Sequence, residues 1–351
     1  MTQHQSRSEA FVKLGTFFSD FCSYDKNKAK PTKLFAEFDE IITLAKHKNG
    51  WFTRENIMFS IENWGALLTE KQLKNWLTPY TLTEIENVVA IIMAGNIPLV
   101  GFHDFLAVLL TGNKALVKLS SNDTILLPFI SKVLIAADGS LKDKIEFTDQ
   151  KLENFDKVIA TGSNNTARYF EYYFKGKQHI IRKNRNSVAV LTGNETTEEL
   201  TALGEDIFRY YGLGCRSVSK LFVPEGYNFD AFFKAIYAFN PIINQMKYAN
   251  NYDYNKAVYL MSEFKLLDNG FLMLKEDESY SSPIASLFYE TYGSLEALKE
   301  KLKEDEELIQ CIVSKDFLNQ EIAFGQTQKP SLSDYADNAD TIAFLLETQT
   351  L

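Results

Sequence analysis

The chain has 351 residues, 45% of them hydrophobic and 24% charged, and a net charge of −9. This length exceeds the usual size of one domain and predicts two lobes, each with its own core. The acidic balance argues against a nucleic-acid surface as the main partner. Three scattered cysteines are too few for a disulfide framework or a tetrahedral zinc site, so no metal is expected.

The first ten residues are polar, unlike a secretory signal, and the longest apolar stretch (residues 88–93) is far too short to span a bilayer. We therefore expect a cytoplasmic protein with reduced thiols and no membrane span. Up to residue 83, apolar residues spaced three and four apart predict helices. These helices are expected over 9–24, 31–48 and 54–67, with Trp51, Trp64 and Trp76 as packing residues.

From residue 84, short apolar strands alternate with helices. Strands are predicted over 88–93, 115–119, 144–147, 157–160 and 187–191, and helices over 101–110, 124–136 and 167–174. This alternation, with a polar turn after each strand, predicts a parallel, doubly wound sheet. Ligands bind such sheets outside the carboxyl ends of the strands, so the loops around Asn96, Ser120 and Ser163 should lie along one edge.

A second α/β unit is predicted to begin near Asn194. It should contain helices over 196–211, 229–239 and 294–303, and strands over 220–223, 265–275 and 284–291. The chain is thus divided into a helical N-terminal segment (1–83), a first sheet domain (84–193), a second domain (194–330) and a tail (331–351). We expect the tail to return to the core or to join an oligomer interface.

Cys215 is the strongest candidate for chemistry. It lies in Gly212-Leu213-Gly214-Cys215-Arg216-Ser217. Glycines allow a turn tight enough to expose the sulfur, and an adjacent cation or helix N-terminus favours the thiolate. The alternative is a small buried side chain, the usual fate of a reduced cysteine.

Three turns after strands of the first sheet carry polar groups. The Asn96 amide can donate to an oxyanion, Lys118 can meet ribose or phosphate oxygens, and the turn at Gly162 and Ser163 opens a helix whose N–H groups suit an anion. Each of these residues can equally be explained by turn formation and helix capping. Neither GxGxxG after the first strand nor a Walker A motif is present.

Taken together and in this order, these segments resemble the aldehyde dehydrogenase superfamily, and most closely its LuxC-type acyl-CoA reductases. The resemblance runs from about residue 88 to 346. It rests on Gly95-Asn96-Ile97-Pro98-Leu99-Val100-Gly101-Phe102-His103-Asp104, Val117-Lys118-Leu119-Ser120-Ser121, Ala160-Thr161-Gly162-Ser163, the Cys215 segment, Phe324-Gly325-Gln326 and the tail from Asp334.

The resemblance implies an aldehyde-dehydrogenase-like α/β fold, with a nicotinamide-binding domain over 84–193 and a catalytic domain over 194–330. It implies Cys215 as the nucleophile, with Asn96 and the Cys215 backbone N–H binding the oxyanion. Lys118 with the neighbouring Ser120 and Ser121, and Gly162 with Ser163, are implied to contact the cofactor. A homo-oligomer is also expected.

Two departures from the superfamily's pattern are informative. Where oxidative members carry a Glu that activates water, alignment through Ser187 places Arg182, so a thioester on Cys215 should not be hydrolysed efficiently. Where members that prefer NAD carry a Glu after the lysine motif, this chain has Ser121. Without a carboxylate to repel a 2′-phosphate, NADPH is the expected cofactor.

The segment 175–185 is basic and contains His179. This histidine can activate Cys215 or protonate a leaving thiol, or it can be an ordinary surface residue. The basic side chains can meet coenzyme A phosphates, although a solvated face is the preferred interpretation. His103, beside Asp104, is interpreted as structural.

The expected function is therefore reduction of an acyl-CoA or acyl-protein thioester to an aldehyde through an acyl-cysteine, with an acyl-activating synthetase as a possible supplier of the acyl group. One alternative is a reductase of the same scaffold that acts on an acyl phosphate. The other is a non-catalytic partner of an acyl carrier or synthetase, in which the thiol would be unreactive and cofactor binding weak.

Overall fold

The structure is a computed structural model, and it describes residues 3–27, 30–82 and 86–347. The chain forms two compact units, one of Met1–Lys183 with Ser331–Leu351 and the other of Asn184–Pro330. The boundary therefore lies ten residues before the predicted one, because the strand at residue 186 pairs in the second sheet. The predicted boundary at residues 83 and 84 falls outside the described residues.

The N-terminal helices belong to the first unit and share its core. They are α1 (Gln3–Asn27), α2 (Lys33–Lys48), α3 (Arg54–Leu67) and α4 (Glu70–Leu77). Thr53 and Thr69 begin α3 and α4 by accepting a backbone N–H on their hydroxyls, as N-caps do. Phe38 of α2 stacks on Phe129, which lies beyond the predicted segment, at 4.9 Å between ring centroids. The segment is thus a layer of the first unit and has no separate core, and α4 was not predicted.

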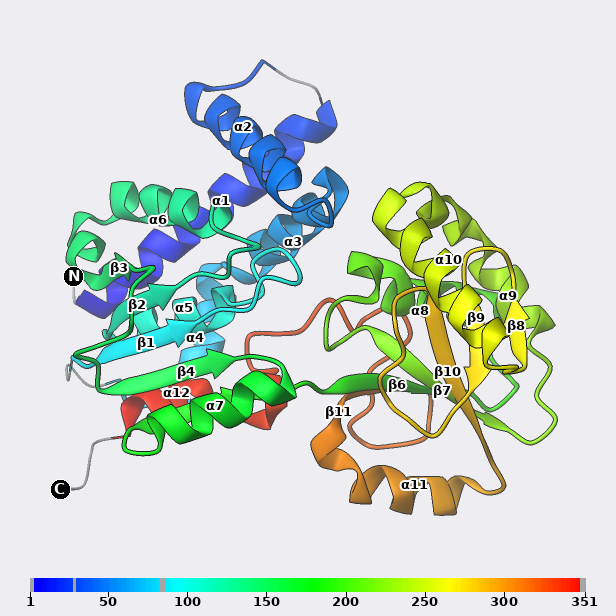
Figure 1. Cartoon of the computed structure of the whole chain (residues 1–351). Helices are drawn as coiled ribbons and strands as arrows, with labels where there is room; N and C mark the ends of the chain where they lie inside the picture. The colour runs from blue at the N-terminus through cyan, green and yellow to red at the C-terminus, as the bar shows by residue number, and fades with distance from the viewer. Residues whose placement is uncertain (1–2, 28–29, 83–85, 348–351) are drawn as a thin grey trace. The chain divides into compact units, whose positions relative to one another are not determined.

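The first sheet is parallel and has the strand order β3-β2-β1-β4-β5 (Figure 1). Its strands are β1 (Val88–Ile92), β2 (Lys114–Lys118), β3 (Ile145–Phe147), β4 (Lys157–Thr161) and β5 (Gln178–Arg182), and its helices are α5 (Phe102–Leu110), α6 (Leu126–Ala137), α7 (Asn164–Phe174) and the short η1 (Gly139–Lys144). Alternate strand residues, such as Ile91 and Ala90, enter separate cores on the two faces. This confirms the predicted doubly wound sheet. The edge strand β5 was missed because its sequence is largely polar and basic.

The C-terminal tail returns to the core of the first unit, one of the two expected outcomes. After η5 (Ala336–Asn338), α12 (Thr341–Leu346) buries Ile342 and Leu345 beside the residues of α5. The buried Lys157 on β4 donates to the backbone carbonyls of Phe344 and Glu347, at 2.6 and 2.7 Å. Backbone carbonyls of the tail therefore provide hydrogen-bond acceptors for the buried ammonium group of Lys157.

The second unit is built on a mixed sheet of order β11-β6-β7-β10-β9-β8, in which β8 runs antiparallel to β9. The strands are β6 (Asn186–Val190), β7 (Val218–Pro224), β8 (Leu266–Asp268), β9 (Met273–Glu276), β10 (Ser286–Tyr292) and β11 (Ile309–Val313). The helices are α8 (Thr197–Phe208), α9 (Asp230–Ile236), α10 (Met246–Met261) and α11 (Leu295–Glu304), with short turns η2 (Arg209–Gly212), η3 (Tyr237–Asn244) and η4 (Glu306–Leu308).

Three elements of the second unit differ from the prediction. The stretch 265–275, predicted as one strand, is a hairpin, because Gly270 turns the chain with φ of +91°. Helix α10 and strand β11 were not predicted. Nothing in the described parts of the chain is a helix long and apolar enough to cross a membrane.

Candidate active site

The polar residues expected at the edge of the first sheet lie where the parallel register brings strand ends together. Ile92, at the end of β1, is paired with Lys118 of β2 and with Ala160 of β4. The loops that carry Asn96, Ser120 and Ser163 therefore leave the same edge of the sheet. The structure thus brings these predicted residues to one side of the first unit.

The loop that carries Asn96 is tightly packed. A Cβ atom on Gly95 would lie 2.6 Å from Ser120 Oγ, so any other residue here would force the neighbouring loop to shift. Ser60 of α3 donates to the Pro98 carbonyl at 3.2 Å, and Leu99 adopts a left-handed φ of 59°. The half-buried Asn96 is thus presented on a loop fixed from two sides, as an oxyanion donor requires.

The residues expected to contact a nicotinamide cofactor fit that role in type and placement. Lys118 is the last residue of β2, and its ammonium group lies 3.0 Å from the Gln150 carbonyl. Ser121, in the loop that follows β2, is exposed. Ser163 caps α7 by accepting from Thr166 N at 3.3 Å. The start of a helix favours an anion such as a cofactor phosphate. Within the described residues, no cluster of His, Cys, Asp and Glu could hold a metal ion.

His179 lies away from this edge. It is paired with Val158 near the start of β4, so it lies toward the amino ends of the strands. Its imidazole is exposed, and Nδ1 is 2.9 Å from the Lys177 carbonyl. Within the first unit the structure therefore does not bring His179 together with Asn96, Lys118 and Ser163. The register of β5 places His179 near the amino ends of the strands, whereas the other three residues lie at or beyond the carboxyl ends.

Arg182 is a buried structural residue. Its guanidinium pairs with Asp104 of α5 and donates to Thr341 Oγ1 of α12 at 3.0 Å. The cation thus joins the sheet to the helix and the returning tail. A glutamate at this position, as in the oxidative members, would put a second carboxylate beside the buried Asp104 and would lose this pairing.

The rest of the basic segment and His103 behave as structural or solvated groups. Lys183 pairs with Glu171 at 2.8 Å on the surface. Lys175 and Lys177 are exposed, in line with a solvated face. The His103 ring packs against Trp76, and its Nε2 is 2.9 Å from the Leu332 carbonyl, in agreement with the structural interpretation.

Cys215 occupies a turn between α8 and β7 in the second unit. The turn is closed by Ser217 N, which donates to the Gly214 carbonyl at 3.0 Å. None of the chain's cysteines forms a disulfide, and Cys215 is exposed whereas Cys22 and Cys311 are buried. Burial raises the pKa of the Cys22 thiol to about 11, and the nearby Glu62 adds to this shift. Cys215 is therefore the accessible thiol, as predicted from the glycines beside it.

The backbone before Cys215 is strained. The predicted helix ends at Phe208, three residues early, and Tyr210 and Tyr211 adopt left-handed φ angles of 55° and 60°, followed by Gly212 at 74°. Such conformations cost non-glycine residues on the order of 1 kcal/mol each and concentrate at functional sites. Strain next to the exposed thiol supports a functional interpretation of this turn.

Arg216 reaches strand β11 of the second unit. Its guanidinium donates to the buried Cys311 Sγ at 3.5 Å, across to β11.

Asp206, near the end of α8, is a residue that the sequence analysis missed. It is fully buried and accepts from Gly325 N at 2.6 Å, Thr327 N at 2.9 Å and Thr327 Oγ1 at 2.8 Å. Burial raises the pKa of its carboxyl group to about 6. The contact ties the helix before Cys215 to the loop 324–327. An acid on the otherwise apolar face of the helix was the available signal.

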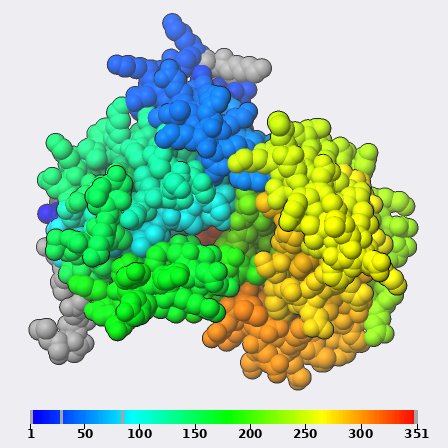
Figure 2. Space-filling model, in the orientation of Figure 1, coloured from blue at the N-terminus to red at the C-terminus, as the bar shows by residue number. Residues whose placement is uncertain are grey.

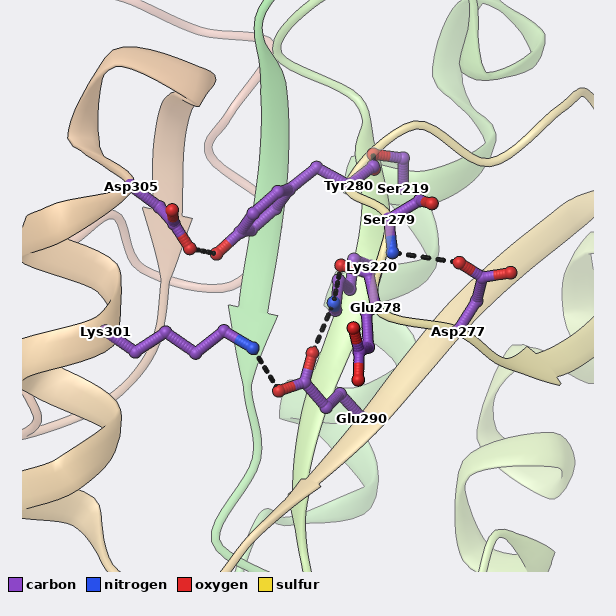
Figure 3. A network of polar contacts seen from close by, with 9 residues as sticks. All are labelled: Ser219, Lys220, Asp277, Glu278, Ser279, Tyr280, Glu290, Lys301 and Asp305. Carbon is purple, nitrogen blue, oxygen red and sulfur yellow. Dashed lines mark hydrogen bonds and ion pairs between the residues drawn. The ribbon is translucent and has the colours of Figure 1, made fainter.

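A buried ionic network fixes β7, the strand after Cys215, and it was also missed (Figure 3). The fully buried Lys220 donates to Glu290 Oε2 of β10 and to the Glu278 carbonyl, both at 2.6 Å. Glu290 also pairs with Lys301 of α11. Ser219 donates to the Tyr280 carbonyl at 2.7 Å. A lysine inside an apolar strand was the sequence signal for this network.

Comparison with known proteins agrees with this architecture. The family model for acyl-CoA reductase (LuxC) matches residues 29–246, more than half of the chain. No curated protein matches the chain.

Solved structures resemble the chain at low sequence identity. A mutant aldehyde dehydrogenase from Bacillus cereus matches with a TM-score of 0.62 and 15% identity over 91% of this chain and 72% of its own. An indole-3-acetaldehyde dehydrogenase mutant from P. syringae, in complex with NAD+ and IAA, matches with a TM-score of 0.64 and 12% identity over 90% and 72%. A putative methylmalonate-semialdehyde dehydrogenase from Sinorhizobium meliloti, complexed with NAD, gives 0.62 and 13% over 89% and 72%.

These similarities establish the fold, and the family model covers both the Asn96 loop and the Cys215 turn. The protein has the aldehyde-dehydrogenase-like fold and belongs to the acyl-CoA reductase (LuxC) family.

Proposed function

We propose that the protein reduces an acyl thioester to an aldehyde with NADPH, through an acyl group held on Cys215. The observation that carries the proposal is the exposed Cys215 thiol on a strained, glycine-rich turn, in a chain whose other thiols are buried. Membership of an acyl-CoA reductase family supports the substrate class. An oxidoreductase of this kind needs an accessible nucleophile and a hydrogen-bond donor that stabilises the negative charge on the carbonyl oxygen.

In the proposed acylation step, the Cys215 thiolate attacks the thioester carbonyl carbon and a new C–S bond forms. The Asn96 side-chain N–H is proposed to donate to the oxygen as its negative charge develops. The bond to the carrier sulfur then breaks, and the carrier leaves as a thiol after taking up a proton. Asn96 is suited to this role because its amide can donate without changing its own charge.

Reduction needs two electrons on the acyl carbon, which a bound nicotinamide cofactor supplies as hydride. Lys118 and the residues Ser120, Ser121, Gly162 and Ser163 are proposed to hold that cofactor. When the bond between the acyl carbon and Cys215 sulfur breaks, the aldehyde leaves and the thiolate is regenerated. The preference for NADPH is proposed because Ser121 offers no negative charge to a 2′-phosphate.

The acyl-cysteine should resist water. Arg182 stands where oxidative relatives are expected to carry their base, and a guanidinium does not accept a proton. Its buried pairing with Asp104 further supports a structural role. We therefore expect the acyl group to persist without cofactor and to pass readily to added thiols. Rapid release of free acid would contradict the proposed reduction and would indicate an oxidative function instead.

The decisive experiment is incubation with acyl-CoAs of several chain lengths, followed by intact mass measurement. An acyl adduct should form, and Cys215→Ala should abolish both the adduct and aldehyde formation while NADPH binding is retained. Cys22→Ala and Cys311→Ala are the matched controls and should keep the adduct. Label on Cys22 or Cys311 in the parent protein would refute the assignment.

The same experiment separates the other functions. An acyl-phosphate reductase would form the adduct from acyl phosphates in preference to acyl-CoAs. A non-catalytic binding partner would give no adduct and only weak NADPH binding in a fluorescence titration.

We also propose that the protein is a homo-oligomer. Helix α7 exposes Tyr169, Tyr172 and Tyr173, with exposed fractions of 66%, 70% and 71%. The segment to which this helix belongs is green in Figure 2. Exposed aromatic groups spaced three and four apart on one helix suit a protein interface. Light scattering should show an oligomer for the parent protein and a smaller species when all three are changed to Ser.

A further inference from the structure

Ser187, at the start of β6, makes a contact with the reactive residue that the proposed mechanism does not use. Its side chain is fully buried, and its Oγ donates to the Cys215 carbonyl oxygen at 2.9 Å. A buried hydroxyl needs a hydrogen-bond partner, and the partner of Ser187 lies in a turn 28 residues away in the sequence. The bond holds the peptide group between Cys215 and Arg216.

The way in which β6 and β7 pair places Ser187 for this contact. Ser187 is opposite Val218, whereas the next residue, Val188, is opposite Lys220, so the register shifts by one residue at this point. Such irregularities in strand pairing re-aim side chains and are frequent beside active sites. Here the shift lies next to the serine that reaches the Cys215 turn.

The rest of the turn is held by other contacts. Ser217 N closes it on the Gly214 carbonyl, and Ser217 Oγ accepts from Gln328 Nε2 at 3.3 Å. After it, β7 is anchored through the buried Lys220. The Ser187 bond acts at the centre of the turn, where it restrains the backbone torsion ψ of Cys215 and hence the direction of its Cα–Cβ bond.

We propose that Ser187 is a positioning residue for the nucleophile, a role that rests on the proposed function of Cys215. Ser187 touches neither substrate nor reacting atoms and acts through the backbone of Cys215. Loss of its hydroxyl should misdirect the thiol and leave its intrinsic reactivity intact. Small errors in the placement of a reacting group cost about 10²-fold in rate in the unfavourable case.

The test compares Ser187→Ala with the conservative Ser187→Thr and with Ser282→Ala. Ser282 donates to the Ser286 carbonyl at 2.8 Å in the same unit, so its loss removes the same kind of bond away from Cys215. Ser187→Ala should lower the rate constant of acylation by acyl-CoA about 10- to 100-fold, with little change in KM. Ser187→Thr should restore most of the rate, and Ser282→Ala should match the parent protein.

Alkylation by iodoacetamide separates positioning from structural damage. This small reagent reaches an exposed thiol from many directions, so Cys215 should be alkylated at nearly the parent rate in Ser187→Ala. The buried Cys311 reports whether the second unit stays folded. Faster labelling of Cys311 that accompanies the loss of acylation would mean damage to the fold and would overturn the proposal, as would a parental acylation rate in Ser187→Ala.

A separate measurement does not depend on the proposed reaction. Cys215-Arg216 is the only Cys-Arg pair in the sequence, so ¹³C-carbonyl cysteine with ¹⁵N-arginine gives one NMR signal for this peptide. Its carbonyl shift should change in Ser187→Ala and stay in Ser282→Ala. An unchanged shift would overturn the positioning role. If the parent protein forms no acyl adduct, the proposed function fails, while the carbonyl shift still decides whether Ser187 holds Cys215.

Discussion

Glu290→Gln is expected to destabilise the second unit strongly. Glu290 is the carboxylate partner of Lys220, whose side chain is fully buried, and its own side chain is only 22% exposed. Burial lowers the pKa of Lys220, whereas the bond to Glu290 opposes that shift. Removal of one partner of a buried ion pair leaves the other charge uncompensated and costs about 3–5 kcal/mol. The partial exposure of Glu290 favours the lower end, about 3 kcal/mol.

Cysteine protection can measure this loss unit by unit. Cys311 is buried in the second unit and Cys22 in the first, so pulsed alkylation read by peptide mass reports the opening of each. A loss of about 3 kcal/mol raises the population of open forms, and hence Cys311 labelling, about 10²-fold. Cys22 labelling should stay at the parent rate.

Glu278→Gln is the matched control. The Glu278 side chain is exposed, and Lys220 uses only its backbone carbonyl, so the change should stay within about 0.5 kcal/mol. Parental Cys311 protection in Glu290→Gln would refute the reasoning, because Lys220 would then be neutral or hydrated in the folded state. Equal acceleration in both variants would show that the loop 277–280, and not the ion pair, controls opening.

Three further predictions concern the site. Asn96→Ala should slow single-turnover acylation about 10²- to 10³-fold with a much smaller change in substrate affinity, and a loss of affinity with normal turnover would make Asn96 a structural turn residue. Ser121→Glu should shift the ratio of kcat/KM values from NADPH toward NADH by about 1–2 kcal/mol through charge repulsion, whereas equal use of both cofactors by parent and variant would contradict the assignment. Asp206 has a folded pKa near 6, above its ordinary value, so ionisation costs the folded state; stability should fall by about 2–3 kcal/mol as pH rises from about 4 to above 6. Urea unfolding should show this slope in the parent protein and lose it in Asp206→Asn, and an unchanged slope would assign it to another group.

The sequence by itself determined the parallel, doubly wound character of the first sheet and the exposed turn at Cys215. Runs such as 88–92 are apolar and bounded by polar turns, so their strand character is set by local composition, and their parallel order follows from the alternating helices. The glycines beside Cys215 are likewise a local signal for a tight, exposed turn. Both features depend on residues that are close together in the sequence, so they can be recognised without the tertiary structure.

The tertiary structure decided where polar residues go. Arg182 and His179 lie in the same basic segment, yet the structure buries Arg182 against Asp104 and leaves His179 exposed toward the other end of β5. Whether each side chain is buried or exposed depends on the face of the strand to which it points and on its neighbours across the sheet. The sequence of a polar edge strand reveals neither of these. The same reason explains why β5 was missed.

The domain boundary and the support of Cys215 also required the fold. The strand at 186–190 reads like those before it, and only its hydrogen bonds to β7 and β11 assign it to the second unit. Ser187 and Asp206 reach partners 28 and about 120 residues away, at Cys215 and at the loop 324–327. Buried polar groups satisfy their hydrogen bonds wherever the chain returns to them, and that return is a property of the packed structure.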